Sequence, residues 1–154
     1  PNYICIVPEN RKEITTEGGL NLDKNQKKLK NIIQIFKQAK IRTSLFVNPT
    51  IRDIKLSKDL NTDCVEIHTG RLSNLVKSKK NYYTELNRIK KSSLLAKKLN
   101  IEVHAGHGLD YQTTKILSKI NEIQEFNIGH FIIGESIFFG LSKVIRNFKK
   151  ILKK

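Results

Sequence analysis

The chain places its histidines and one of its glutamates in, or just after, short apolar runs. An imidazole changes its charge near neutral pH, and a carboxylate inside an apolar run is costly unless another group pairs with it. Side chains of both kinds can move protons during a reaction when they lie at the end of a strand. The residues that fit this description are Glu66, His68, His104, His107 and His130.

The side chains of a strand alternate between its two faces. In the run CVEIHTG, Glu66 and His68 therefore share one face, and in IEVHAG the same rule pairs Glu102 with His104. If the aliphatic residues between them pack against helices, the polar side chains point away from those helices. His107 lies between two glycines, which would let a ligand approach the backbone closely. We therefore treat His107 as the leading candidate for chemistry.

Two glycine-containing loops, AGHGLD and IGHFIIGES, follow the last two apolar runs. Barrel enzymes often bind phosphate with the loops after their last two strands and with the N-terminus of an adjoining helix. We therefore expect these loops to form a phosphate site. The expected hydrogen-bond donors are Gly106, Gly108, Gly129, His130, Gly134 and Ser136.

The loop PENRKEITTEGG follows the first apolar run and is long enough to be functional. Thr15, Thr16 and Glu17 could bond a hydroxyl or phosphate group of a substrate. An equally good interpretation is that they form a capping arrangement before the helix expected near residue 24.

The apolar periodicity alternates between strand and helix along the chain, which predicts βα units. Such units form a parallel sheet covered by helices, and polar residues at the end of nearly every strand are typical of a barrel. No G-x-G-x-x-G follows the first strand, as it would in an open dinucleotide-binding sheet. We expect strands at 3–7, 41–47, 64–70, 101–106 and 125–130, and helices near 24–39, 50–60, 80–99, 111–119 and 134–152.

The predicted fold class is α/β, with residues 1–154 as a single domain. Five units cannot close an eight-stranded barrel, and the sequence contains no methionine, not even at position 1. We therefore expect an incomplete (β/α)8 TIM barrel with about the last five βα units of a longer protein.

The chain has a formal net charge of +15 at pH 7, but its lysines are spread in pairs over several predicted helices. Nucleic-acid binding would need a continuous positive stripe, so we expect no nucleic-acid partner. We also expect no membrane partner, because no apolar run is long enough to span a bilayer. Cys5 and Cys64 are isolated in apolar runs and are expected to be reduced, small buried side chains.

Four stretches together resemble the pyridoxine 5'-phosphate synthase family: VPENRKEITTEGGL, VEIHTG, HAGHGLDY and NIGHFIIGESIFFGL. They occur in the order of the family and span the chain. The resemblance implies a ring-closing condensation of 3-amino-2-oxopropyl phosphate with 1-deoxy-D-xylulose 5-phosphate, giving pyridoxine 5'-phosphate, phosphate and water. It also implies a cytoplasmic TIM-barrel transferase that needs no metal or organic cofactor and assembles as a homo-octamer.

The same resemblance implies roles for individual residues. The histidine of the family's AGHG loop is the proton donor, which corresponds to His107, and the glutamate of its EIHTG strand is the transition-state stabiliser, which corresponds to Glu66. The two glycine loops would hold the amino-ketone phosphate, and the TTEGG stretch would contact the deoxyxylulose phosphate. The residues expected to bind substrate are Thr15, Gly108, Gly129 and His130, with Thr16, His68 and His104 as further candidates.

Two other functions remain open from the residues themselves. A metal-dependent isomerase or lyase on a phosphate-binding barrel would use Glu66 and the histidines as ligands, although no H-E-x-x-H pairing occurs. A basic, non-catalytic binding module would use the lysine surface. The family's N-terminal strands, with an N-V-D-H-V type motif and further acid–base groups, do not occur in this sequence. We therefore expect these 154 residues to be inactive by themselves.

Overall fold

The computed structural model describes residues 1–8 and 18–153. This part of the chain forms an α/β fold with five parallel strands and seven helices, consistent with an incomplete TIM barrel. The strands are β1 (Tyr3–Ile6), β2 (Arg42–Val47), β3 (Cys64–His68), β4 (Glu102–Gly106) and β5 (Ile123–Asn127). The helices are α1 (Leu22–Gln38), α2 (Ile51–Asp59), α3 (Gly70–Lys77), α4 (Tyr83–Lys98), α5 (Tyr111–Leu117), α6 (His130–Phe139) and α7 (Leu141–Leu152).

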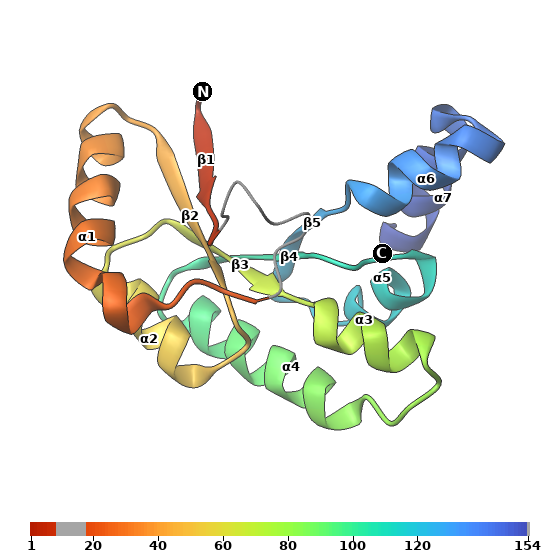
Figure 1. The fold of residues 1–154 in the computed structure, drawn as a ribbon, viewed down its shortest axis with the longest axis horizontal. Coiled ribbons are helices and arrows are strands. Elements are labelled where there is room, and N and C mark those ends of the chain that lie inside the picture. The colour runs from red at the N-terminus through yellow and green to blue at the C-terminus, as the bar shows by residue number, and fades with distance from the viewer. Residues whose placement is uncertain (9–17, 154) are drawn as a thin grey trace.

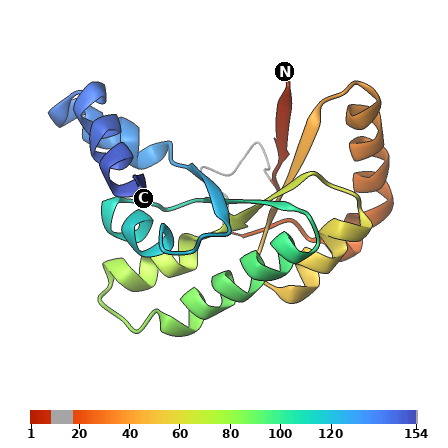
Figure 2. The same ribbon diagram turned by 180° about the vertical axis from the view of Figure 1, so that it is seen from behind.

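Each strand of the sheet pairs with the next one along the chain, in the order β1-β2-β3-β4-β5. Figure 1 and Figure 2 show a curved sheet with α1 to α5 along one side, while α6 and α7 lie beyond β5. Because all strands run parallel, the loops that follow them gather at one edge of the sheet. This arrangement brings the segments after β3, β4 and β5 together.

The two faces of the sheet differ in the way that the alternation of side chains predicts. Val65, Ile67 and Val103 point to the helices and are at most 1% exposed, as members of the hydrophobic core. Glu66 and His104 occupy the alternate positions of β3 and β4, and the register places them side by side. We call the side of the sheet that carries these polar residues the inner face.

The helix after β4 begins where the sequence predicts. Asp110 is the N-cap of α5 and accepts a hydrogen bond from the backbone N–H of Thr113 at 2.8 Å. The Thr113 hydroxyl in turn accepts from the backbone N–H of Asp110 at 2.9 Å, which completes a capping box. This cap fixes the end of the loop that carries His107.

Three element predictions are wrong in part. The chain enters α3 directly after β3, although no helix was expected between the strand at 64–70 and residue 80. The expected strand at 125–130 ends at Asn127, so that His130 begins α6. The expected final helix at 134–152 is two helices, because Gly140 interrupts it with a φ of +78°. The break puts Ile137 out of phase with the apolar face of α7, and Ile137 is 78% exposed.

The helix α6 is the segment with the most exposed apolar surface. Ile133, Phe138 and Phe139 are more than half exposed, together with Ile137. Despite this apolar character α6 has only ten residues, and no helix within the described residues has the length and composition to cross a bilayer.

We predict that Ile67→Ala destabilises the fold strongly, because Ile67 is fully buried between β3 and the helices. The expected loss is about 2–5 kcal/mol in the free energy of unfolding, from lost burial and the cavity that remains. Urea unfolding of the full-length gene product measures it. Ile35→Ala on α1 is the control, because Ile35 is 62% exposed and should change stability by less than about 0.5 kcal/mol. Equal effects of the two substitutions would contradict the assignment of the core.

Candidate active site

The inner face of the sheet carries two of the residues that the sequence singled out, Glu66 and His104. Glu66 lies near the middle of it, on β3, and is partly buried. The side-chain amide of Asn127 on β5 donates a hydrogen bond to Glu66 Oε2 at 2.7 Å, and the Cys5 thiol on β1 donates to the same oxygen at 3.6 Å. Burial raises the pKa of Glu66, while the hydrogen bonds from Asn127 and Cys5 partly oppose that shift.

His68 and His107 form a pair of rings at the end of β3. Their ring centroids lie 4.8 Å apart with planes tilted by 30°, and Phe46 packs edge-on against His68 at 5.4 Å. A Cβ on Gly70 would approach His107 Cδ2 to 2.7 Å and His68 Nε2 to 2.9 Å. Gly70 therefore leaves the space that lets the two imidazoles lie against each other.

The loop that carries His107 is held by Thr69. The Thr69 hydroxyl lies 2.7 Å from the carbonyl oxygens of both Gly106 and His107, and the Thr69 backbone N–H also donates to the Gly106 carbonyl at 2.9 Å. The φ angles of His107 and Gly108 are +77° and +74°. A histidine rarely adopts such a backbone angle, and strain of this kind concentrates at functional sites.

The charge environment of His107 favours its neutral form. Burial lowers the pKa of His107 below its usual value, and the positive charges of His130 and Lys77 lower it further. The Lys77 ammonium also donates to the Gly108 carbonyl at 3.3 Å. His107 is therefore a base at neutral pH and can take up a proton before it gives one.

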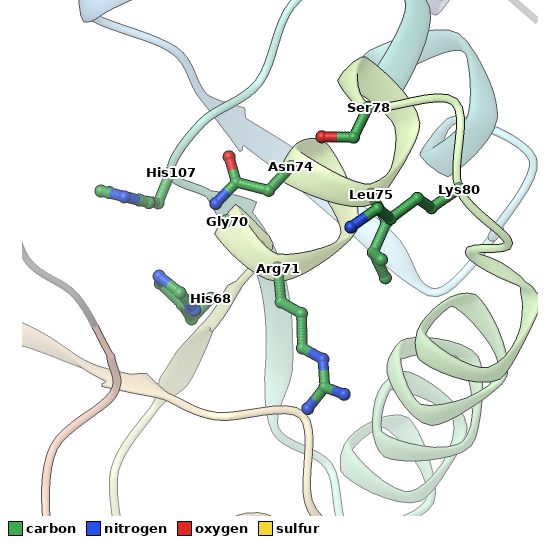
Figure 3. A pocket seen from close by; sticks show the side chains of 8 residues that line it. All are labelled: His68, Gly70, Arg71, Asn74, Leu75, Ser78, Lys80 and His107. Carbon is green, nitrogen blue, oxygen red and sulfur yellow. The ribbon is translucent and has the colours of Figure 1, made fainter.

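A pocket of about 530 Å³ opens beside the two histidines. Figure 3 shows His68 and His107 on one side of it, with Arg71 and Asn74 from α3 and Lys80 from the following loop on the other. The pocket is thus lined by cationic and neutral polar groups next to two imidazoles. This composition suits an anionic ligand such as a phosphate ester.

The second glycine loop ends at the start of α6, whose N-cap is Gly129 and whose first residue is His130. Within the described residues no N-cap side chain binds the first N–H groups of this helix, which suits them to an anion. Gly134 and Ser136, expected as donors in the same loop, lie inside α6 instead. The amide of Gly134 falls in the second turn, and the hydroxyl of Ser136 donates to the Ile132 carbonyl.

Thr15 and Thr16 lie outside the described residues, so their predicted contacts with substrate stay predictions. The end of the same stretch is anchored at the C-terminal edge of β2. The backbone N–H of Gly19 donates to Asn48 Oδ1 at 3.0 Å, and that of Leu20 donates to the Phe46 carbonyl at 2.8 Å. A Cβ on Gly19 would lie 2.3 Å from the Asn48 backbone nitrogen, so only glycine fits there.

His104 lies beside Glu66 on the inner face and also joins a hydrogen-bonded network with residues at the N-terminal ends of the strands. Glu102 Oε1 lies 2.8 Å from His104 Nε2, and the Tyr3 hydroxyl lies 3.0 Å from His104 Nδ1. Glu102 also accepts a hydrogen bond from Arg42 at 2.6 Å, and the same guanidinium lies 3.2 Å from Cys64 Sγ. Both ring nitrogens of His104 are therefore engaged by protein groups.

This network contains a combination of side chains that could hold a metal ion. Ligand atoms of Cys64, Glu102 and His104 lie within 4.8 Å of one another. The guanidinium of Arg42 already supplies a positive charge between Cys64 and Glu102, however, and a cation would have to displace it. Burial also raises the pKa of the Cys64 thiol to about 11, which disfavours the thiolate that binds metals. The geometry favours an internal salt-bridge network.

The two cysteines differ from the expectation in their surroundings. Both are free thiols and Cys64 is fully buried, as expected, whereas Cys5 is only partly buried. Each sulfur also lies near a polar partner, Glu66 for Cys5 and Arg42 for Cys64. Burial and the nearby Glu66 raise the pKa of Cys5 to about 12, so Cys5 acts as a neutral S–H donor to Glu66.

Comparison with known protein sequences identifies the family of the chain. The sequence profile of the family described as "Pyridoxal phosphate biosynthesis protein PdxJ" matches residues 1–154. The chain belongs to the PdxJ family. A relative from Pelagibacter ubique is 65% identical over the whole chain, and relatives from Zymomonas mobilis and Sulfurihydrogenibium are 45% and 44% identical over 99% of it. All three are named pyridoxine 5'-phosphate synthase.

The chain is shorter than these PdxJ relatives. It spans 64% of the length of the Pelagibacter protein and 59% and 62% of the Zymomonas and Sulfurihydrogenibium proteins. Its five strands therefore correspond to part of what the relatives contain.

Sequence reasoning missed three residues that shape the site, namely Thr69, Gly70 and Asn127. The first two directly follow His68 in the motif that carries Glu66, and their position at a strand end was a usable signal. Asn127 had no such signal, because its contact with Glu66 joins residues 61 positions apart.

We predict that Lys77→Met raises the pKa of His107. Lys77 carries a positive charge that disfavours imidazolium, so removing the charge makes protonation easier. NMR titration of the histidine ring protons in the full-length gene product measures the shift. Lys28→Met, at an exposed position on α1, is the control and should leave the titration unchanged. An unchanged or lower pKa in Lys77→Met would contradict the electrostatic account.

We also predict that Glu102→Gln removes part of the acid sensitivity of the fold. The hydrogen bond from His104, with help from Arg42, lowers the pKa of Glu102 against the opposing effect of burial. Its stabilising contribution is therefore present above the unfolded pKa of about 4.3 and is lost as pH falls through the lower folded value.

Urea unfolding of the full-length gene product between about pH 3 and about pH 6 measures this contribution, as a flatter dependence of stability on pH in Glu102→Gln. Asp59→Asn, at an exposed position on α2, is the control. A slope equal to that of the wild type would show that Glu102 does not contribute.

Proposed function

We propose that this chain forms part of a pyridoxine 5'-phosphate synthase. The reaction would condense 3-amino-2-oxopropyl phosphate with 1-deoxy-D-xylulose 5-phosphate, close a ring, and release pyridoxine 5'-phosphate, phosphate and water. The observation that carries the proposal is the convergence of the two most characteristic motifs. Thr69 of EIHTG binds the backbone of the AGHG loop, and this bond sets His107 beside the pocket of about 530 Å³.

His107 is proposed as the proton donor. Its lowered pKa favours a neutral ring, which can first accept a proton from one intermediate and then donate it to the next. A bound phosphate would add negative charge near His107 and Lys77, and would raise the pKa of the imidazole again. The proton would therefore be held when substrate is present.

Glu66 is proposed as the transition-state stabiliser. A partly buried carboxylate interacts strongly with positive charge that develops on an iminium-type intermediate, because little water screens it. The hydrogen bond from Asn127 helps to keep this carboxylate ionised against the cost of its burial. The charge would then be in place before the reaction begins.

The phosphate groups are proposed to bind at the glycine loops. Gly108, Gly129 and His130 would hold the amino-ketone phosphate, supported by the uncapped start of α6. Thr15 would contact the deoxyxylulose phosphate, with Thr16 and His68 as further candidates. His104 has both ring nitrogens bound within the protein, so we assign it a structural role.

We further propose that the active form is a cytoplasmic homo-octamer and that these 154 residues do not turn over alone. The five-stranded sheet leaves β1 and β5 unpaired on their outer edges within the described residues. Further strands are needed to enclose a site on the inner face.

The test is a coupled assay of the full-length gene product with both phosphorylated substrates. We expect pyridoxine 5'-phosphate to form with EDTA present, and His107→Ala to lower kcat about 10²–10⁴-fold through lost proton transfer. Glu66→Gln should lower kcat about 10²–10³-fold. Lys28→Ala, at an exposed position on α1, is the control for both.

Three outcomes would redirect the assignment. Absence of product from a well-folded wild-type protein would reject the synthase. Activity that EDTA abolishes would favour a metal-dependent barrel enzyme. Full activity of His107→Ala would keep the family but remove the role of His107.

A further inference from the structure

The carboxylate of Glu66 is clamped by residues from three other strands. Asn127 on β5 and Cys5 on β1 both donate to Oε2. Gly106 on β4 lies under the other oxygen, because an added Cβ at Gly106 would be only 1.9 Å from Oε1. A single acidic side chain on β3 thus meets residues of β1, β4 and β5.

The contact between Asn127 and Glu66 depends on Gly106 being a glycine, with no side chain between them. The register of the sheet pairs Gly106 with Asn127 and with His68, so Gly106 lies on the strand between Asn127 and Glu66. A Cβ on Gly106 would also come within 3.3 Å of Asn127 Cβ. Because Gly106 has no side chain, the side chains of Asn127 and Glu66 can reach each other across its backbone.

The chemistry of the contact favours an ionised glutamate. The side-chain amide of Asn127 presents N–H to Oε2, and hydrogen bonds to a carboxylate are stronger than those between neutral groups. The thiol of Cys5 stays protonated and adds a weaker donor to the same atom. Because Asn127 and Cys5 hold Oε2, the other oxygen, Oε1, lies above the backbone of Gly106.

We propose that Asn127 is a positioning residue for the reaction: its amide reaches across Gly106 and fixes both the direction and the ionised state of the Glu66 carboxylate. Asn127 itself touches no substrate in this scheme. It acts through Glu66, with Cys5 as a secondary donor. The inference rests on the proposed function, because Glu66 is the group that Asn127 orients.

The test compares Asn127→Leu and Asn127→Asp in the full-length gene product. Leucine has a similar size but no donor, so kcat should fall about 10- to 100-fold, as for loss of a hydrogen bond to a charged group. KM should change little. The acidic limb of the kcat profile should move to higher pH, because the ionised form of Glu66 loses support.

Asn127→Asp should shift the acidic limb further in the same direction. It places a second carboxylate next to Glu66, and two such groups hold a shared proton tightly. A merely structural role of Asn127 would lower stability without moving the pH profile. Asn31→Leu, at an exposed position on α1, is the matched control.

Gly106→Ala provides an independent check. The new methyl group should push the Glu66 carboxylate aside and lower kcat by a similar factor. Adding Asn127→Leu in that background should then have little further effect, since the contact is already broken. Fully additive losses would overturn the proposal.

A readout without catalysis separates this inference from the proposed function. In protein with ¹³C-labelled glutamate, NMR titration of the Glu66 carboxyl should show a higher pKa in Asn127→Leu than in wild type. If the wild type makes no product but this pKa shift occurs, the synthase assignment is wrong. The effect of Asn127 on the Glu66 carboxylate is then still supported. If wild type is active and Asn127→Leu matches it in kcat and in pH profile, the positioning role is wrong.

Discussion

The hydroxyl of Thr69 bonds to two successive carbonyls of the neighbouring loop, those of Gly106 and His107, at 2.7 Å each. This contact joins the end of β3 to the loop after β4, and the rest of the site depends on it. It holds His107 in a backbone conformation that histidine seldom adopts. The ring of His107 is thereby set against His68 and at the rim of the pocket.

Glycines perform a related task at two places on the inner face. At Gly70 the missing side chain gives room to the paired imidazoles, and at Gly106 it gives room to the Glu66 carboxylate. Each motif therefore contains one reactive side chain and one glycine. The glycine leaves room for the reactive side chain of the other motif. EIHTG makes room for His107, and AGHG makes room for Glu66. This mutual fit gives a physical reason why the two motifs occur together.

The inner face also separates two kinds of electrostatic environment. Near the N-terminal edge, Arg42, Glu102 and His104 satisfy one another, and the pKa of Glu102 is lowered. Beside this network burial raises the pKa of Glu66, and in the loop after β4 burial lowers that of His107. The charges of Arg42 and Glu102 balance each other. Glu66 and His107 have shifted pKa values, which suits them to proton transfer. Perturbed groups beside a pocket are typical of a functional site.

The sequence alone determined the parallel βα architecture, the shared face of Glu66 and His68, and the position of His107 just beyond a strand end. Each of these follows from a local pattern: the alternation of side chains or the position of a glycine. It could not determine the break at Gly140 or the helix at Gly70–Lys77. Only the tertiary structure decided that Asn127 meets Glu66 across Gly106 and that Arg42 occupies the space between Cys64 and Glu102. Those contacts depend on which strands are neighbours and in what register, and that information is absent from any short stretch of the chain.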